Sequence, residues 1–102
     1  MGARIRDLFA VARALAADGA AYIFVTNQES ATVSVIATAS DEIAATIPVA
    51  SAPASIAVDR DGTTLYVTHP ERGEISVIDA GKREVVRSLK VSGTPFGIAV
   101  SQ

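Results

Sequence analysis

The sequence predicts an all-β fold made of β-propeller blades, and two observations lead to this prediction. First, the chain repeats itself at an offset of 42 residues: residues 24–60 align with residues 66–102 without a gap and are identical at 12 of 37 positions. Second, each repeat contains four short segments with the alternating, β-branched pattern of strands. A period in the low forties with four strands per unit is typical of propeller blades. A sandwich of about eight strands is the alternative, but its strands need not recur in register.

The strands are expected in the same order in both repeats. In the first repeat they cover residues 22–26, 32–36, 42–49 and 55–58, and in the second 64–68, 74–78, 84–91 and 96–100. Pro48 marks an edge position, because proline cannot donate to a strand ladder. Asp59–Gly62 predicts a tight hairpin turn, with Gly62 at positive φ. Asp59 and Asp61 also resemble part of a calcium loop, but the further oxygen ligands that such a loop needs are missing, which favours the turn.

The phase of the repeat predicts how the blades are divided. If the apolar strand after the proline is innermost, residues 54–91 form a full blade, and residues 94–100 form the inner strand of a further blade. Residues 22–49 then supply a partial blade of three outer strands, so that residues 21–102 hold two repeats.

Two blades cannot close a ring, because propellers use about 4–8 blades. We therefore expect a homo-oligomer, a trimer or tetramer ring closed by strand exchange, in which Phe96–Val100 pairs with Tyr22–Thr26 of a neighbouring subunit. The alternatives are a fragment of a longer propeller, natural or engineered, and a two-blade monomer.

Residues 1–20 differ from the repeats and are expected to form a short N-terminal helix. They are rich in alanine and leucine, their apolar residues recur at helical spacing, and Gly19 is placed to end the helix. One alternative is a signal-peptide remnant, although Asp7 and Arg13 interrupt its apolar segment. Another is a degenerate strand, because Asp18-Gly19 resembles the Asp61-Gly62 turn that precedes the second repeat.

The composition excludes several kinds of partner and site. The net charge is −2 and aromatic residues make up 5%, without the basic stripe or stacking platform of nucleic-acid binders. The absence of cysteine excludes disulfides, thiolate metal sites and a cysteine nucleophile. No apolar run is long enough to span a membrane.

Several segments resemble the YVTN-family β-propeller repeat: Tyr66-Val67-Thr68, Ile75–Asp79, Pro95–Val100 and Asp61-Gly62. The resemblance covers residues 22–102, with His69 standing where the family has asparagine. It implies a propeller fold and a periplasmic or extracellular location, while a cytoplasmic one stays open. Relatives include surface-layer proteins, lactonases, and haem-bearing or quinone-linked propellers, so the repeat implies no single function.

The candidate binding residues are polar side chains in the loops that follow the Tyr-Val-Thr strands. In a propeller these loops share one rim of the ring and form a polar surface for a protein or small-molecule partner. The candidates are Asn27, Gln28, Glu29, His69, Glu71 and Arg72. His69 is the only histidine and is expected to be a solvated turn residue, since a lone histidine makes a poor metal site.

No catalytic residue set and no cofactor motif is found in the sequence. We therefore interpret the protein as a non-enzymatic propeller scaffold or binding module. The alternative is a fragment or subunit of a propeller enzyme, lactonase-like or a haem- or quinone-linked oxidoreductase accessory protein.

Overall fold

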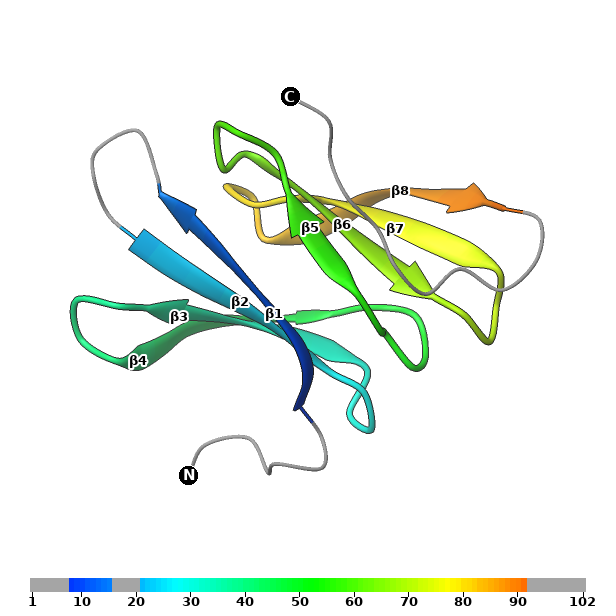
Figure 1. Cartoon of the computed structure of the whole chain (residues 1–102), viewed down its shortest axis with the longest axis horizontal. Coiled ribbons are helices and arrows are strands. Elements are labelled where there is room, and N and C mark those ends of the chain that lie inside the picture. Colours follow the sequence, from blue (N-terminus) through cyan, green and yellow to red (C-terminus); the bar gives the residue numbers. More distant parts are fainter. Residues whose placement is uncertain (1–7, 16–20, 92–102) are drawn as a thin grey trace.

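The computed structural model describes the backbone of residues 8–15 and all of residues 21–91, and these segments form two four-stranded antiparallel sheets (Figure 1). The first sheet, blade 1, has the order β1-β2-β3-β4, and the second, blade 2, has the order β5-β6-β7-β8. The strands are β1 (Leu8–Leu15), β2 (Ala21–Asn27), β3 (Thr32–Ala37), β4 (Glu42–Pro48), β5 (Ile56–Val58), β6 (Thr64–His69), β7 (Glu74–Asp79) and β8 (Glu84–Lys90). Within the described residues no helix has the length and apolar character needed to cross a membrane.

The N-terminal segment forms a strand, so the expected helix is wrong for residues 8–15. β1 pairs antiparallel with β2, with Leu15 opposite Ala21 and Ala10 opposite Thr26. Helix propensity is a weak preference, and the free backbone groups along the edge of β2 offer hydrogen bonds that a helix would leave unmade. The degenerate-strand alternative is therefore confirmed for residues 8–15, and blade 1 has four strands rather than three.

This pairing also changes the expected mode of assembly. The sequence predicts that the edge of β2 accepts Phe96–Val100 of a neighbouring subunit, but β1 of the same chain occupies this edge. The strand expected over residues 96–100 lies outside the described residues.

The sequence repeat is preserved in the details of both sheets. The outer strand pair of blade 1 has a register shift between Val35 and Ile36, and that of blade 2 has the same shift between Val77 and Ile78. A β-bulge of this kind increases the local twist of a sheet, as the blades of a propeller require. The two blades are therefore equivalent in register as well as in strand order.

The turns repeat too, even where the residues differ. Ala31 and Gly73, at equivalent positions, have φ values of 56° and 61°, and Asp41 and Arg83 have values of 58° and 62°. Three of these four residues are not glycine, so the sheet geometry imposes a left-handed conformation that side chains disfavour.

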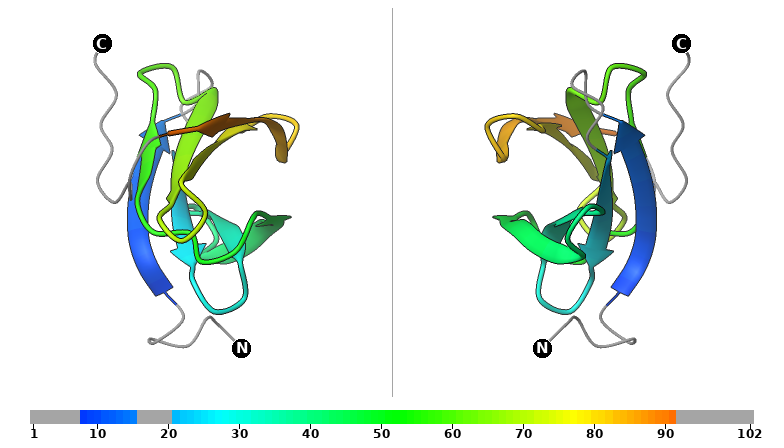
Figure 2. Two further views of the ribbon diagram at one scale, coloured as in Figure 1. Left: turned by 90° about the vertical axis from the view of Figure 1, so that its right-hand side faces the viewer. Right: turned by 90° about the vertical axis from the view of Figure 1, so that its left-hand side faces the viewer.

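The core lies between the two blades, which pack face to face (Figure 2). The innermost strands β1 and β5 contact each other, and the outer strands β4 and β8 contact each other less extensively, so the two sheets spread outwards like blades of a propeller (Figure 2). The buried core residues are Phe24, Val33, Val35 and Ile47 from blade 1 and Ile56, Leu65, Val67, Ile78 and Ala80 from blade 2.

Candidate functional site

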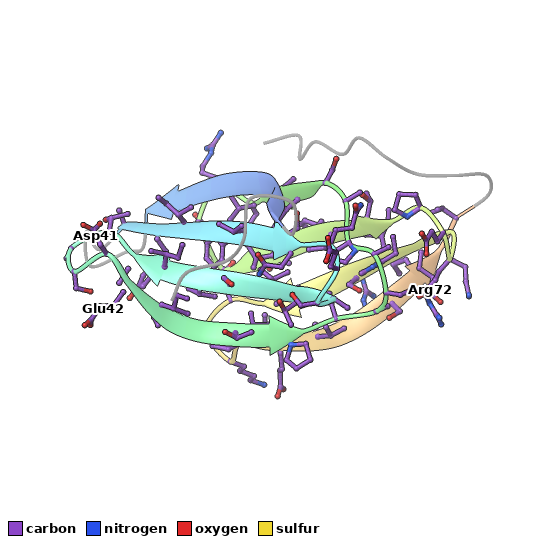
Figure 3. The ribbon with its side chains drawn as sticks, turned by 90° about the horizontal axis from the view of Figure 1, so that it is seen from below. Asp41, Glu42 and Arg72 are labelled. Atoms are coloured by element: carbon purple, nitrogen blue, oxygen red, sulfur yellow. The ribbon has the colours of Figure 1, made fainter. Side chains whose placement is uncertain are left out.

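The polar edge comprises the ends of β2 and β6 with the loops that follow them, residues 27–31 and 69–73. Figure 3 places Arg72 at one end of the blades and Asp41 and Glu42 at the opposite end. All six sequence candidates belong to the polar edge, but the structure divides them. Glu29, Glu71 and Arg72 are exposed, Gln28 is half-buried, and Asn27 and His69 are buried with 3% and 0% of their surface exposed.

His69 is a buried structural residue, so its expected role as a solvated turn residue is wrong. Its Nδ1 lies 3.2 Å from the carbonyl oxygen of Ser51 and its Nε2 lies 2.6 Å from Ser76 Oγ. A carbonyl only accepts, so Nδ1 carries the proton and donates it, and Nε2 accepts from the Ser76 hydroxyl. Burial lowers the pKa of His69 more than the Ser51 carbonyl and the Glu74 carboxylate raise it. The imidazole is therefore held neutral, away from solvent.

Asn27 occupies the equivalent position in blade 1 and makes an equivalent contact. Its Nδ2 donates to Ser34 Oγ at 2.8 Å and to Thr32 Oγ1 at 3.1 Å. Its Oδ1 is buried and has no hydrogen-bond partner. An unpaired buried acceptor costs about 1–3 kcal/mol, so Asn27 leaves one polar atom unsatisfied, whereas both ring nitrogens of His69 have partners.

The segment that crosses from blade 1 to blade 2, residues 49–55, is held by hydrogen bonds from both blades. Thr26 Oγ1 of blade 1 donates to the Ala54 carbonyl at 3.0 Å. In blade 2, the Thr68 amide donates to the Ser55 carbonyl at 2.9 Å, and Thr68 Oγ1 accepts from the Ser55 amide at 2.9 Å. Together with the contact from His69 to Ser51, these bonds fix the angle at which the blades meet. The buried part of the polar edge thus serves the architecture.

Arg72, a candidate for binding, is engaged in an ion cluster on the same edge. Its Nε lies 3.2 Å from Glu74 Oε1, and Lys90 Nζ lies 2.7 Å from Glu74 Oε2. The hydrogen bonds from Lys90 and then Arg72 lower the pKa of Glu74. The cluster neutralises a carboxylate whose side chain is only 9% exposed.

The Asp59 side chain confirms the turn interpretation of its segment. Its carboxylate accepts hydrogen bonds from the Thr63 amide and hydroxyl, both at 2.9 Å, and from the Thr64 amide at 3.2 Å. Burial alone would raise the pKa of Asp59, but these hydrogen bonds outweigh burial and lower it. Gly62 adopts a φ of 72° in the same turn. Across residues 21–91 the structure brings together no group of three or more His, Asp or Glu side chains that could hold a metal ion.

Sequence reasoning missed the serines that bind the two buried residues of the polar edge. Ser34 follows Asn27 by seven residues, and Ser76 follows His69 by the same interval. In both repeats this spacing makes the polar residue and the serine diagonal neighbours on one face of the hairpin, because the serine lies two residues beyond the residue directly opposite. That recurrence was a signal for a paired, buried contact.

Solved structures of other proteins share this arrangement. The chain resembles Kuenenia stuttgartiensis hydrazine synthase with 26% identity and a TM-score of 0.84, over 99% of this chain and 28% of that one. It resembles apo AztD from Citrobacter koseri with 26% identity and a TM-score of 0.74, over 90% of this chain and 26% of that one. A second structure of Citrobacter koseri AztD, at 24% identity, has the same TM-score of 0.74. The chain thus spans about a quarter of the length of these proteins.

A search of curated proteins finds no significant match. The sequence model of the YNCE-like β-propeller family matches residues 3–101, which is nearly the whole chain. The two four-stranded blades and the radiating arrangement agree with that match. The chain therefore belongs to the YNCE-like β-propeller family.

Proposed function

We propose that this protein is a non-enzymatic β-propeller scaffold or binding module that completes its ring by stacking copies of itself. Each blade contributes one face to the core, and the other blade carries a counterpart of that face. Both counterparts are partly exposed, and this observation carries the proposal. Equivalent positions of the two blades lie 42 residues apart.

The first uncovered surface is on blade 1. In blade 2, the cross-strand row Leu65–Ile78–Val85 faces blade 1; Leu65 and Ile78 are fully buried there, and Val85 packs against the same core. The equivalent row of blade 1 is Ile23–Ile36–Ile43. Its first two residues are half-buried, and Ile43 is 50% exposed. An isoleucine row of this kind suits burial against another blade.

The second uncovered surface is on blade 2. In blade 1, Val33 and its cross-strand partner Ile47 are 0% and 1% exposed because blade 2 covers them. The equivalent pair in blade 2 is Ile75 and Leu89, of which Ile75 is half-buried and Leu89 is 37% exposed. A neighbouring blade that docks as blade 2 docks on blade 1 would bury both residues.

The Ile43 surface of one copy therefore complements the Leu89 surface of the next. Such a head-to-tail contact closes a ring when its rotation closes. Three copies would make six blades and four copies would make eight, both within the range of propellers. Because β1 occupies the edge of β2, the proposed contact joins sheet faces and needs no strand exchange.

The test is the solution mass of the full chain, 10.5 kDa, by light scattering coupled to size exclusion. We expect a mass of three or four chains. Leu89→Glu and Ile43→Glu should each abolish the ring, while the exposed-turn control Asp61→Lys should leave it intact. A folded wild-type monomer at high concentration would contradict the proposal.

Mixing the two variants gives a sharper test. A Leu89→Glu chain keeps its Ile43 surface, and an Ile43→Glu chain keeps its Leu89 surface. The mixture should therefore form a dimer of one chain of each kind and nothing larger. If circular dichroism shows that each variant is folded and the mixture is still monomeric, the head-to-tail arrangement is contradicted.

The exposed part of the polar edge is the proposed binding surface for a protein or small-molecule partner. Glu29 and Glu71 are exposed at equivalent positions, so a ring would present several such carboxylates along one rim. The YVTN-type repeat in residues 22–102 supports a periplasmic or extracellular location for this surface.

The second candidate function is a portion of an enzyme's propeller. It is favoured by the likeness to hydrazine synthase, which covers 99% of this chain but only 28% of that protein. An enzyme subunit of the kinds that the repeat suggests should show haem absorbance, quinone-linked oxidation or lactone turnover. For the scaffold we expect none of the three in the purified ring.

A further inference from the structure

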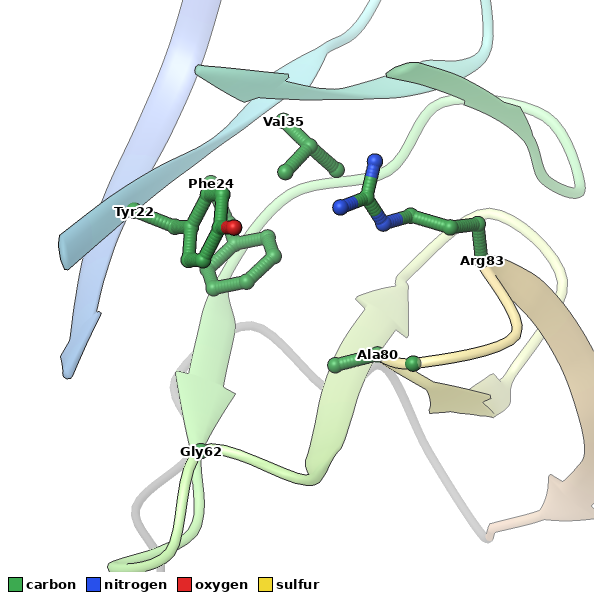
Figure 4. Close-up of a pocket in the computed structure, with 7 residues that line it drawn as sticks. Tyr22, Phe24, Val35, Gly62, Ala80 and Arg83 are labelled. Atoms are coloured by element: carbon green, nitrogen blue, oxygen red, sulfur yellow. The ribbon is translucent and has the colours of Figure 1, made fainter. Parts of the chain in front are cut away.

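A pocket of about 210 Å³ opens between the two blades (Figure 4). Its lining includes the β7–β8 turn, at the other end of β7 from the polar edge. Its walls come from the start of β2, from β3, and from the β5–β6 and β7–β8 turns. The lining residues are Tyr22, Phe24, Val35, Gly62, Ala80, Gly81 and Arg83. Most of this wall is aromatic or aliphatic, and one side chain, Arg83, carries a charge.

Arg83 reaches from blade 2 across the pocket to blade 1. Its guanidinium carbon lies 5.7 Å from the centre of the Tyr22 ring, a cation–π distance (Figure 4). Among residues 21–91 no carboxylate forms an ion pair with Arg83. A guanidinium presents five N–H donors in a planar fork. Within residues 21–91 the guanidinium makes no side-chain hydrogen bond besides this contact with the Tyr22 ring, so its N–H donors are available to a ligand.

Arginine is not required here by the turn or by the repeat. Arg83 has a φ of 62°, a conformation that glycine and asparagine adopt at lower cost. At the offset of 42 residues, the counterparts of Arg83 and Tyr22 are Asp41 and Thr64, which cannot form this pair. The Arg83–Tyr22 contact is thus particular to the junction inside this chain.

We propose that this pocket binds a small organic carboxylate with a flat apolar body. The carboxylate accepts two parallel hydrogen bonds from the Arg83 guanidinium, the geometry that arginine favours. The apolar body lies against Phe24, Val35 and Ala80, which supply the hydrophobic contact. The small volume restricts the ligand to about one ring with its carboxylate. This site lies inside one chain, so it does not depend on ring closure.

Benzoate is the probe that tests the proposal, with benzamide as its neutral counterpart of the same shape. Backbone amide resonances of Gly62 and Gly81 report binding by NMR in the full-length protein. We expect saturable shifts with benzoate, which weaken as salt is added. Benzamide should bind at least tenfold more weakly. Equal binding of the two compounds, or shifts that never saturate, would overturn the proposal.

Two variants distinguish the contribution of the Arg83 charge to binding from the contribution of the pocket volume. Arg83→Gln should weaken benzoate binding at least tenfold, whereas Arg87→Gln, at an exposed position on β8, should not change it. Gly81→Leu should block binding by filling the pocket. A β-carbon at Gly81 meets only Asp79 Oδ1, at an ordinary 3.4 Å, so this variant has room to fold. If the Arg83→Gln variant does not fold, the Gly81→Leu variant and the comparison with benzamide still test the site. Unchanged benzoate binding in Gly81→Leu would show that benzoate binds elsewhere and would refute the proposal.

Discussion

His69 Nε2 lies 2.6 Å from Ser76 Oγ, in a contact that is closed to solvent. The equivalent contact in blade 1 joins Asn27 Nδ2 to Ser34 Oγ at 2.8 Å. In both blades the pair bridges the hairpin between the second and third strands at the polar edge. The same structural role is thus filled by an amide in one blade and by a titratable ring in the other, so protonation of the ring can disrupt this contact only in blade 2.

Replacing His69 by its counterpart, His69→Asn, should flatten the dependence of stability on pH. Burial keeps the pKa of His69 below its usual 6.5. Below pH 6.5, therefore, His69 is protonated in the unfolded chain but still largely neutral in the folded chain. The free energy of unfolding of the wild type therefore falls as the pH drops from 6.5 towards the lower folded-state pKa, by at most about 1.4 kcal/mol per pH unit. Urea unfolding between about pH 7.5 and 5.5 measures this slope.

The other charged groups near His69 do not account for this pH dependence of the free energy of unfolding. Glu74 and Arg72 both face the ring, and their effects on the pKa of His69 are opposite in sign. The carboxyls of Glu74 and Asp59 also have lowered pKa values, but their usual values of 4.5 and 3.8 lie below the measured range. An equal slope in the wild type and in His69→Asn would show that His69 is not the group responsible.

Ser76→Ala should destabilise the protein by about 1–3 kcal/mol, because it leaves the Nε2 acceptor of His69 buried without a donor. Ser88→Ala is the matched control: Ser88 lies opposite Ser76 on the neighbouring strand and is exposed. Its effect should stay within about 0.5 kcal/mol. Urea denaturation at neutral pH measures both. Equal effects would mean that the hydrogen bond to His69 contributes nothing.

Lys90→Met should raise the pKa of Glu74 towards its usual value, since the hydrogen bond from Lys90 is the largest cause of the lowering. A carboxyl with a lowered pKa contributes stability above its unfolded-state value and loses it as the pH falls through the folded-state value. The variant should therefore lose less stability on acidification below pH 4.5 than the wild type. NMR titration of the Glu74 carboxyl measures the pKa, with exposed Lys82→Met as a control that should leave it unchanged.

Leu65→Ala should cost about 2–5 kcal/mol, because Leu65 is fully buried at the junction of the blades and its truncation leaves a cavity. Val86→Ala, at a position that is 48% exposed on β8, should cost far less. Thermal or urea unfolding of each variant gives the difference. A small effect at Leu65 would mean that the two blades do not share one core.

The 42-residue repeat is sufficient to predict the blades, because it shows which residues are structurally equivalent. It predicts the four strands of blade 2, the three outer strands of blade 1 and the hairpin turn at Asp59–Gly62. It also predicts that Asn27 and His69 share one edge. The strands and the turn depend on alternation and turn chemistry, which lie within a few neighbouring residues. The 42-residue offset then shows which of these local features are equivalent.

Contacts between distant segments decide the remaining features. Residues 8–15 have a helical composition but become β1, because the edge of β2 offers backbone partners. His69 looks like a loop residue, but the carbonyl of Ser51 in the crossing segment and the hydroxyl of Ser76 bury it. The pairing of Arg83 with Tyr22 exists only because blade 2 stacks on blade 1. Residue periodicity cannot express such contacts, because burial depends on which surfaces meet once the blades are packed.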